Sequence, residues 1–205
     1  MGVFMFGVRV LVLAAISVAS CVLFEFLYSR MVGESDSVRD LSACVTGLLL
    51  ALSLPASAPY WAPVLGAAFA IVVVKQFYGG LGKNFMNPAL AARAFLFSWP
   101  VIMTTWVQPG DWAPLFGSSA DAVTSATPLA SLHQSALPAE SLMSLFLGKT
   151  GGCLGETSAL LLLLGGLYLV LRRVIRLRIP LTHLGNVAVL PLHFCGWEAI
   201  SSPAA

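Results

Sequence analysis

The sequence predicts an all-α membrane protein built from several hydrophobic helices. Apolar residues make up 58% of its 205 positions and charged residues only 10%, whereas a soluble globular domain carries about 25% charged residues. The mean hydropathy is +0.88. A chain with so little charge cannot cover its surface for water, so we expect a polytopic bundle surrounded by membrane lipid.

Six hydrophobic segments follow one another along the chain. They cover residues 3–28, 41–54, 62–78, 86–107, 155–171 and 179–195. A complete span needs about 20 apolar residues, and three of the six reach or approach that length. Segment 41–54 is short and is followed by Pro55 and Pro59. It therefore indicates a half-helix or broken helix, as found at the functional midplane of transporters, with a tilted span as the alternative.

Basic residues orient these segments. If the connections alternate sides, eight basic residues fall on one side: Arg30, Arg39, Lys75, Lys83, Arg172, Arg173, Arg176 and Arg178. The other side receives only Lys149. The positive-inside rule then places 29–40, 78–85 and 172–178 in the cytoplasm, and 55–61 and 108–154 outside. The chain would begin outside, so we expect a preceding helix. Because the basic residues lie along one membrane face rather than in one patch, the net charge of +2 is no sign of nucleic-acid binding, and no nucleic-acid partner is expected.

Several short motifs admit a second interpretation. Val18–Cys21 resembles a lipoprotein cleavage site, but apolar residues continue beyond it and further spans follow, which favours a span. Gly82–Lys83 and Gly148–Lys149 both lack the first glycine of a phosphate-binding P-loop. Asn87–Pro88–Ala89 resembles a water-channel motif, but it has no second copy. A helix capped by Asn87 with Pro88 in its first position is the preferred interpretation.

Charges inside apolar segments need partners. Glu25, Arg93 and Glu156 lie in or at the edge of such segments, where an isolated charge costs about 2.5–3.5 kcal/mol at a helix centre. The simpler interpretation is that these charges form structural pairs or, for Glu25, that the side chain snorkels to the membrane interface. The more specific alternative is that they line an ion pathway. Lys75 and Lys83 are interpreted as cytoplasmic anchors.

No metal site is predicted. The cysteines lie far apart without a CxxC pair and are interpreted as small apolar fillers: Cys21, Cys44, Cys153 and Cys195. His183 and His193 have no partner at metal-ligand spacing. His133 lies in the 108–154 loop, where a solvated side chain is preferred over contact with a cofactor.

The 108–154 loop contains the run DAVTSATPL, residues 121–129. A loop of small residues that ends in an accessible threonine is the pattern of a protein that carries a cofactor on a hydroxyl. By spacing alone, Thr127 with Pro128 also fits a helix cap. The wider sequence decides between these interpretations.

Four separated motifs resemble one family. YGGLGKNFMNPALAARAF at 78–95, VTGLLLALSLP at 45–55, GGCLGETSA at 151–159 and the 121–127 run are similar to the D subunit of the Rnf ion-translocating electron-transport complex. They are also similar to the related B subunit of the sodium-translocating NADH:quinone reductase. The resemblance covers roughly residues 5–185.

The resemblance implies a covalent flavin on Thr127. In the family, FMN is joined to this threonine through a phosphoester bond, installed by a flavin transferase that uses FAD. Asp121, Thr124, Ser125 and Ala126 match the other positions of the attachment motif. No residue is assigned a catalytic role.

The resemblance also implies a fold and a function. The fold is an inverted repeat with broken helices, of which this chain covers the first half and the start of the second, so we expect a fragment. Similarity is expected to end near Asn186. The implied function is electron transfer between ferredoxin and NAD in the bacterial inner membrane, coupled to Na⁺ or H⁺ transport, with iron–sulfur and other membrane subunits as partners. The quinone-reductase subunit and a non-redox channel or transporter of the same fold are the alternatives.

The expected organisation has four parts. They are membrane helices of the first repeat at 1–107, an external flavin-bearing loop at 108–154, further membrane helices at 155–195, and an atypical tail at 196–205.

Overall fold

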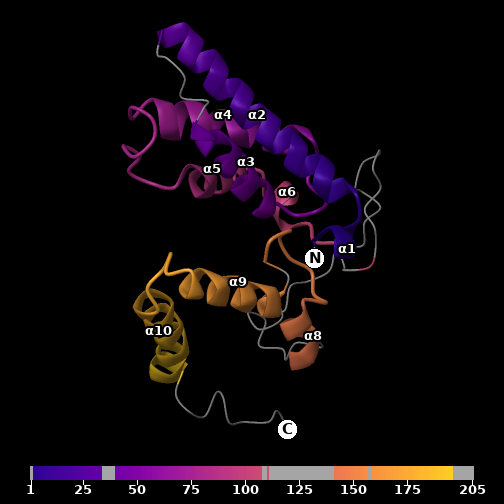
Figure 1. Ribbon diagram of the computed structural model, residues 1–205. Coiled ribbons are helices and arrows are strands. Elements are labelled where there is room, and N and C mark those ends of the chain that lie inside the picture. Colours follow the sequence, from indigo (N-terminus) through magenta and orange to yellow (C-terminus); the bar gives the residue numbers. More distant parts are fainter. Residues whose placement is uncertain (1, 34–39, 108–109, 111–140, 157, 196–205) are drawn as a thin grey trace. The chain divides into compact units, whose positions relative to one another are not determined.

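The computed structural model describes residues 2–33, 40–107, 110, 141–156 and 158–195 (Figure 1). The chain divides into two compact units, residues 1–160 and 161–205. Every regular element in the described ranges is a helix, which confirms the all-α prediction.

The longest apolar element is α2, Arg9–Val32. It is separated from the short α1, Gly2–Phe6, by Gly7 at φ 80°, so the expected 3–28 segment is broken near its start. A helix of 24 residues is about 36 Å long, which exceeds the hydrocarbon thickness of about 30 Å. It is the one helix in the described ranges that is long and apolar enough to cross a membrane. It continues without interruption past Cys21, as a span does.

Helix α3, Ser42–Leu52, is much shorter. Its 11 residues cover about 16 Å, so this helix alone cannot cross the hydrocarbon core. The chain then runs irregularly through Pro55 and Pro59 to α4, Trp61–Ala68. The short helix and the irregular segment after it agree with the predicted half-helix.

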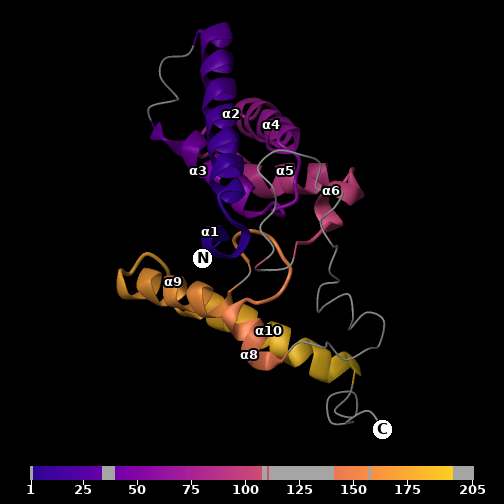
Figure 2. The same cartoon turned by 90° about the vertical axis from the view of Figure 1, so that its right-hand side faces the viewer.

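Helices α2 and α3 approach closely at Gly47. A Cβ atom at Gly47 would lie 2.7 Å from the Cα of Val18, so only glycine permits this approach. Ser17 Oγ donates a hydrogen bond of 2.7 Å to the Gly47 carbonyl. Small residues and hydroxyls at a helix contact are typical of membrane helix packing. Helix α2 contacts both α3 and α4; Figure 2 shows them beside α2, and Figure 1 shows both on the same side of it.

The remaining helices of the first unit pack on this pair. Helix α4 continues directly into the π-helix η2, Phe69–Gln76, and the expected 86–107 segment is divided into α5, Pro88–Leu96, and α6, Pro100–Thr104. The rings of Phe69 and Phe95 stack with their centroids 4.3 Å apart, joining η2 to α5. The core consists mainly of small and aliphatic residues: Cys21, Ala43, Leu50, Leu54, Ala58, Ala67, Ala70, Ile71, Ala89, Ala92, Leu96 and Met103.

Three more helices follow the 111–140 segment. Helix α8, Leu142–Leu147, is capped by the Ser141 hydroxyl. Helices α9, Ala159–Leu171, and α10, Arg178–Cys195, form most of the described second unit. The segments expected at 155–171 and 179–195 therefore form helices with nearly the expected bounds.

Candidate functional site

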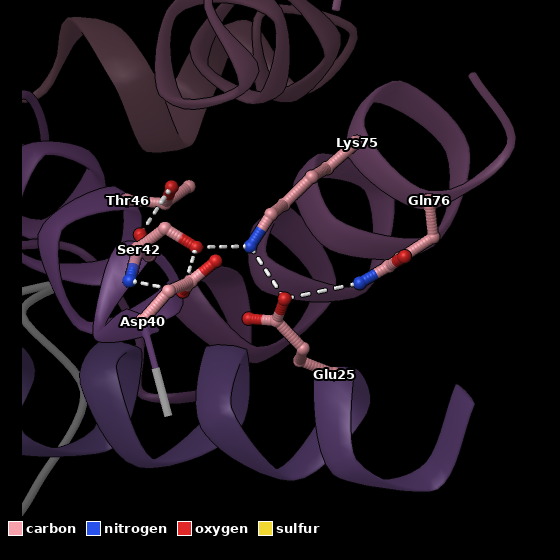
Figure 3. A network of polar contacts seen from close by, with 6 residues as sticks. All are labelled: Glu25, Asp40, Ser42, Thr46, Lys75 and Gln76. Atoms are coloured by element: carbon pink, nitrogen blue, oxygen red, sulfur yellow. Dashed lines mark hydrogen bonds and ion pairs between the residues drawn. The ribbon is translucent and has the colours of Figure 1, made fainter. Parts of the chain in front are cut away.

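A buried ion pair lies between α2 and η2. Lys75 Nζ is 2.5 Å from Glu25 Oε1, and Gln76 Nε2 donates to the same oxygen at 3.0 Å. The Lys75 and Glu25 side chains are 2% and 0% exposed. Lys75 and Gln76 are adjacent on the π-helix, and both reach one carboxylate of α2 (Figure 3). π-Helical turns are rare and are frequent at functional sites.

The pair is extended by the start of α3. Lys75 Nζ also donates to Ser42 Oγ, and Ser42 in turn donates its hydroxyl and its backbone N–H to Asp40 Oδ1, at 2.5 and 2.8 Å. Thr46 Oγ1 donates to the Ser42 carbonyl at 2.9 Å. Figure 3 shows these groups joined in a chain from Glu25 to Asp40. Residues from three separate elements thus form one polar network.

Asp40 keeps its negative charge in this network. Burial alone would raise the pKa of the Asp40 carboxyl, but the two hydrogen bonds from Ser42 and the charge of Lys75 outweigh burial and hold that pKa below its ordinary value. Asp40 therefore remains ionised at neutral pH. The ammonium group of Lys75 faces two carboxylates.

These positions correct one prediction and confirm another. The interpretation of Lys75 as a cytoplasmic surface anchor is wrong, because its side chain is buried and paired with Glu25, whereas Lys83 is exposed. The pairing expected for Glu25 is confirmed, and its full burial excludes snorkelling. Because Lys75 is buried, seven of the eight basic residues that were assigned to the predicted cytoplasmic side still count toward the charge bias.

A cavity of about 700 Å³ opens beside the network. It lies between the start of α3, Lys75 and the connection from η2 to α5. Its lining residues are Asp40, Ser42, Val45, Thr46, Leu49, Lys75, Leu81, Gly82, Asn84, Phe85, Met86, Asn87 and Pro88. Asn84 Oδ1 is buried and has no hydrogen-bond partner among the described residues. The cavity therefore offers several oxygen atoms, one of them an unused acceptor, beside a buried carboxylate and an ammonium group.

Asn87 serves as a helix cap. Its side-chain oxygen accepts hydrogen bonds from the backbone N–H groups of Ala89 and Leu90, at 2.9 and 3.4 Å, and Pro88 occupies the first turn of α5. This arrangement satisfies free N–H groups at the helix start. The capping interpretation of the Asn87–Pro88–Ala89 run is confirmed.

Arg93 forms a second ion pair. Its Nη1 lies 2.8 Å from Glu156 Oε1, and Nη2 donates to the sulfur of Cys153 at 3.3 Å. The pairing expected for Arg93 and Glu156 is confirmed, and the two are each other's partners. Their side chains are 23% and 56% exposed, so this pair is far less buried than that of Lys75 and Glu25. It joins α5 to residues 151–156.

Residues 153–155 pack against the end of α3. Leu154 N–H donates to the Leu54 carbonyl at 3.1 Å, and Gly155 N–H donates to the Leu52 carbonyl at 2.8 Å. A Cβ at Gly155 would lie 3.1 Å from the Leu52 carbonyl oxygen, so glycine permits this approach. Burial, reinforced by the charge of Glu156, raises the pKa of the Cys153 thiol to about 12, which makes it an unreactive filler.

Arg9 donates hydrogen bonds to backbone carbonyls in the irregular segment that follows α3. Its guanidinium donates to the carbonyls of Ala56 and Ala58 at 3.0 and 2.9 Å and lies over the Tyr60 ring at 4.7 Å. Irregular backbone in a membrane protein needs such internal partners. This role was not predicted, although an arginine within an apolar segment was a signal for it.

The two flanks of the 108–154 loop meet at one place. Val107 before the loop and Leu154 at its end belong to one buried cluster with Phe6 and Ala56, and Gly110 N–H bonds to the Met5 carbonyl. The ends of the loop are therefore anchored together near the start of α2. The flavin motif, with Asp121, Thr124, Ser125, Ala126 and Thr127, lies outside the described residues, as does His133.

Replacement of Arg93 is expected to be more harmful than replacement of Lys83. Arg93→Leu should lower the free energy of unfolding by about 1 kcal/mol, because Glu156 loses its charge-assisted bond while solvent screening limits the effect. Lys83→Leu should leave it unchanged. Thermal unfolding of both variants in detergent measures the difference. Equal melting temperatures would mean that Arg93 contributes no more than a surface lysine.

Comparison with known proteins identifies the family. The sequence profile of the NQR2, RnfD, RnfE family matches residues 1–204, which extends past Asn186, where similarity was expected to end. The chain is 47% identical over 195 residues to the D subunit of the Na⁺-translocating ferredoxin:NAD⁺ oxidoreductase complex of Acetobacterium woodii, covering 92% of this chain and 58% of that protein. It is 38% identical over 213 residues to the D subunit of the proton-translocating ferredoxin:NAD⁺ oxidoreductase complex of Clostridium ljungdahlii, covering 97% and 61%.

A third relative is also a D subunit. The D subunit of the ion-translocating oxidoreductase complex of Stutzerimonas stutzeri is 40% identical over 215 residues, covering 92% of this chain and 61% of that protein. The chain thus spans about three fifths of the length of these curated relatives. The chain belongs to the NQR2, RnfD, RnfE family.

Proposed function

We propose that this chain is a membrane subunit of an ion-translocating ferredoxin:NAD⁺ oxidoreductase and that it carries FMN on Thr127. The observation that carries the proposal is the 47% identity to the D subunit of such a complex over 92% of the chain. The motif from Asp121 to Thr127 adds a hydroxyl with small neighbours in the loop. The anchored ends of that loop, with Val107 and Leu154 in one cluster, support its presentation at a defined place.

The chain's own contribution is to hold and present the cofactor. FMN, when bound, supplies reversible electron transfer, and the redox chemistry belongs to it. Thr127 Oγ1 would form the phosphoester to the flavin phosphate in a reaction performed by a separate flavin transferase with FAD as donor. The pyrophosphate bond of FAD would break, AMP would leave, and the hydroxyl proton would be released. Ser125 and Ala126 are small enough to let the threonine reach that enzyme's active site.

The polar network supports the transport part of the proposal. The cavity places oxygens of Asp40, Ser42, Thr46 and Asn84 beside the buried Lys75–Glu25 pair. Oxygen-lined interruptions in helical bundles are where transporters coordinate Na⁺ or H⁺. A cation entering this cavity would lie beside Lys75, the partner of Glu25. The buried pair is thus the place at which ion movement would be coupled.

We place the chain in the bacterial inner membrane, crossing it several times, with the 108–154 loop outside. Seven basic residues on one side against Lys149 on the other support this topology. Cysteine labelling of intact cells with an impermeant reagent tests it: Ser119→Cys should react and Arg173→Cys should not. The reverse pattern would place the loop in the cytoplasm.

The complex-level activity is tested by removing the gene in the native host. Membrane vesicles from the deletion strain should lose ferredoxin-dependent NAD⁺ reduction and the cation uptake that accompanies it. Expression of the wild-type gene in that strain should restore both. Vesicles that keep full ferredoxin-dependent NAD⁺ reduction after deletion would contradict the proposed function.

A further inference from the structure

The turn between α9 and α10 concentrates positive charge. Residues 172–178 contain Arg172, Arg173, Arg176 and Arg178, and all four are exposed. The sequence has no acidic residue between Glu156 and Glu198. Within the described part of the chain no carboxylate forms an ion pair with any of them. Residues 161–195 therefore carry four guanidinium groups of this turn and no acidic residue.

The backbone holds Arg173 in an unfavourable conformation. Val174 N–H bonds to the Leu169 carbonyl and Arg173 N–H to the Val170 carbonyl, both at 2.9 Å, which is the Schellman pattern that ends a helix. The residue at the centre of this pattern, Arg173, has φ 56°. Glycine usually occupies that position because a Cβ is disfavoured in the left-handed region. An arginine in a strained position is an observation from which a functional role can be inferred.

Helix dipoles explain only part of the cluster. Arg172 and Arg173 follow the C-terminal end of α9, where a positive charge is favourable. Arg178 is the first residue of α10 and Arg176 lies two residues before it, at a helix N-terminus where a positive charge is unfavourable. Interaction with helix dipoles therefore accounts for Arg172 and Arg173 but not for Arg176 and Arg178.

Apolar residues alternate with the arginines and identify the kind of anion. Val174, Leu177 and Ile179 are 68%, 54% and 70% exposed, and α9, which precedes the turn, has no buried residue among its described positions. Basic groups beside exposed aliphatic side chains suit the boundary between lipid headgroups and acyl chains. An acidic protein surface would pair with the arginines but would leave these aliphatic residues in water.

We propose that residues 172–179 form a basic turn that binds the phosphate groups of anionic phospholipids in the adjacent leaflet. Guanidinium groups donate paired hydrogen bonds to phosphate oxygens and are less strongly hydrated than ammonium groups. Val174, Leu177 and Ile179 would enter the upper acyl region. The cytoplasmic leaflet carries anionic lipid and attracts such segments, so the basic turn would fix the depth and rotation of α9 and α10.

The test uses the complete chain purified in a neutral detergent. Phosphatidylglycerol, phosphatidylcholine and inorganic phosphate are titrated separately, and bound lipid is counted by native mass spectrometry. Arg173→Gly is the decisive variant, because glycine relieves the left-handed strain while removing one charge. Arg176→Lys keeps the charge, and Lys83→Gln removes an exposed charge elsewhere.

Arg173→Gly should bind phosphatidylglycerol about fivefold more weakly, which is the contribution of about 1 kcal/mol expected per basic residue near a membrane surface. Its melting temperature should be unchanged or higher. Lys83→Gln should bind as the wild type does, and Arg176→Lys should lose less than Arg176→Gln. Equal binding of phosphatidylcholine, displacement of lipid by inorganic phosphate, or unchanged lipid binding in Arg173→Gly would each overturn the proposal.

Discussion

Lys75→Met should lower the free energy of unfolding by about 3–5 kcal/mol, because it leaves a buried carboxylate without its cation. Glu25 is fully buried, and Lys75 Nζ lies 2.5 Å from its Oε1. Gln76 also donates to that oxygen, but a neutral amide cannot balance a full negative charge. Methionine preserves most of the length of the lysine side chain, so the loss reports mainly on charge. Thermal unfolding in detergent, followed by circular dichroism, measures it.

A double variant separates charge from packing. Lys75→Met combined with Glu25→Gln removes both charges, and replacing both partners of a buried pair is often nearly neutral. The double variant should therefore recover most of the lost stability, and Lys83→Met, at an exposed position, should lose none. If the double variant were no more stable than Lys75→Met alone, the destabilisation would come from packing rather than from an unpaired charge.

Helix positions could be predicted from hydrophobicity, but breaks within the helices could not. The segments at 155–171 and 179–195 agree closely with α9 and α10 because apolar runs with polar ends define them. The break at Gly7 and the division of 86–107 into α5 and α6 occur at single residues, Gly7 and Pro100, within runs that remain apolar overall. Such breaks depend on backbone angles and on the partners that satisfy the freed groups, as Arg9 does for Ala56 and Ala58.

Polar partners were only partly predictable. The cost of a charge in an apolar segment predicted that Glu25, Arg93 and Glu156 would be paired. It could not predict which residues are the partners, because the paired residues lie 50 and 63 positions apart in the sequence. The prediction that Lys75 is a cytoplasmic anchor was wrong because Lys75 lies near the end of its hydrophobic segment, where a lysine side chain normally reaches water. The π-helix η2 sets the register that directs it inward instead, and no residue pattern indicated that register.

Loss of the Thr127 hydroxyl is expected to abolish covalent flavin attachment completely. Alanine has no oxygen with which to form a phosphoester, whereas Thr124→Ala removes a hydroxyl at another position of the motif and should retain attachment at least in part. With a flavin transferase and FAD present, wild-type protein should give a fluorescent band on a denaturing gel, and Thr127→Ala should give none. Fluorescence that persists in Thr127→Ala would assign the attachment to another residue.

Mass spectrometry of the peptide that contains Thr127 tests the central claim most directly. The full chain is co-expressed with an active flavin transferase, digested, and sequenced by fragmentation. The peptide should carry an FMN phosphoryl adduct on Thr127, in agreement with the attachment motif that begins at Asp121. An unmodified wild-type peptide, with the transferase shown to be active on a control substrate, would contradict covalent flavin attachment at Thr127 and leave the helix-cap interpretation of Thr127 and Pro128.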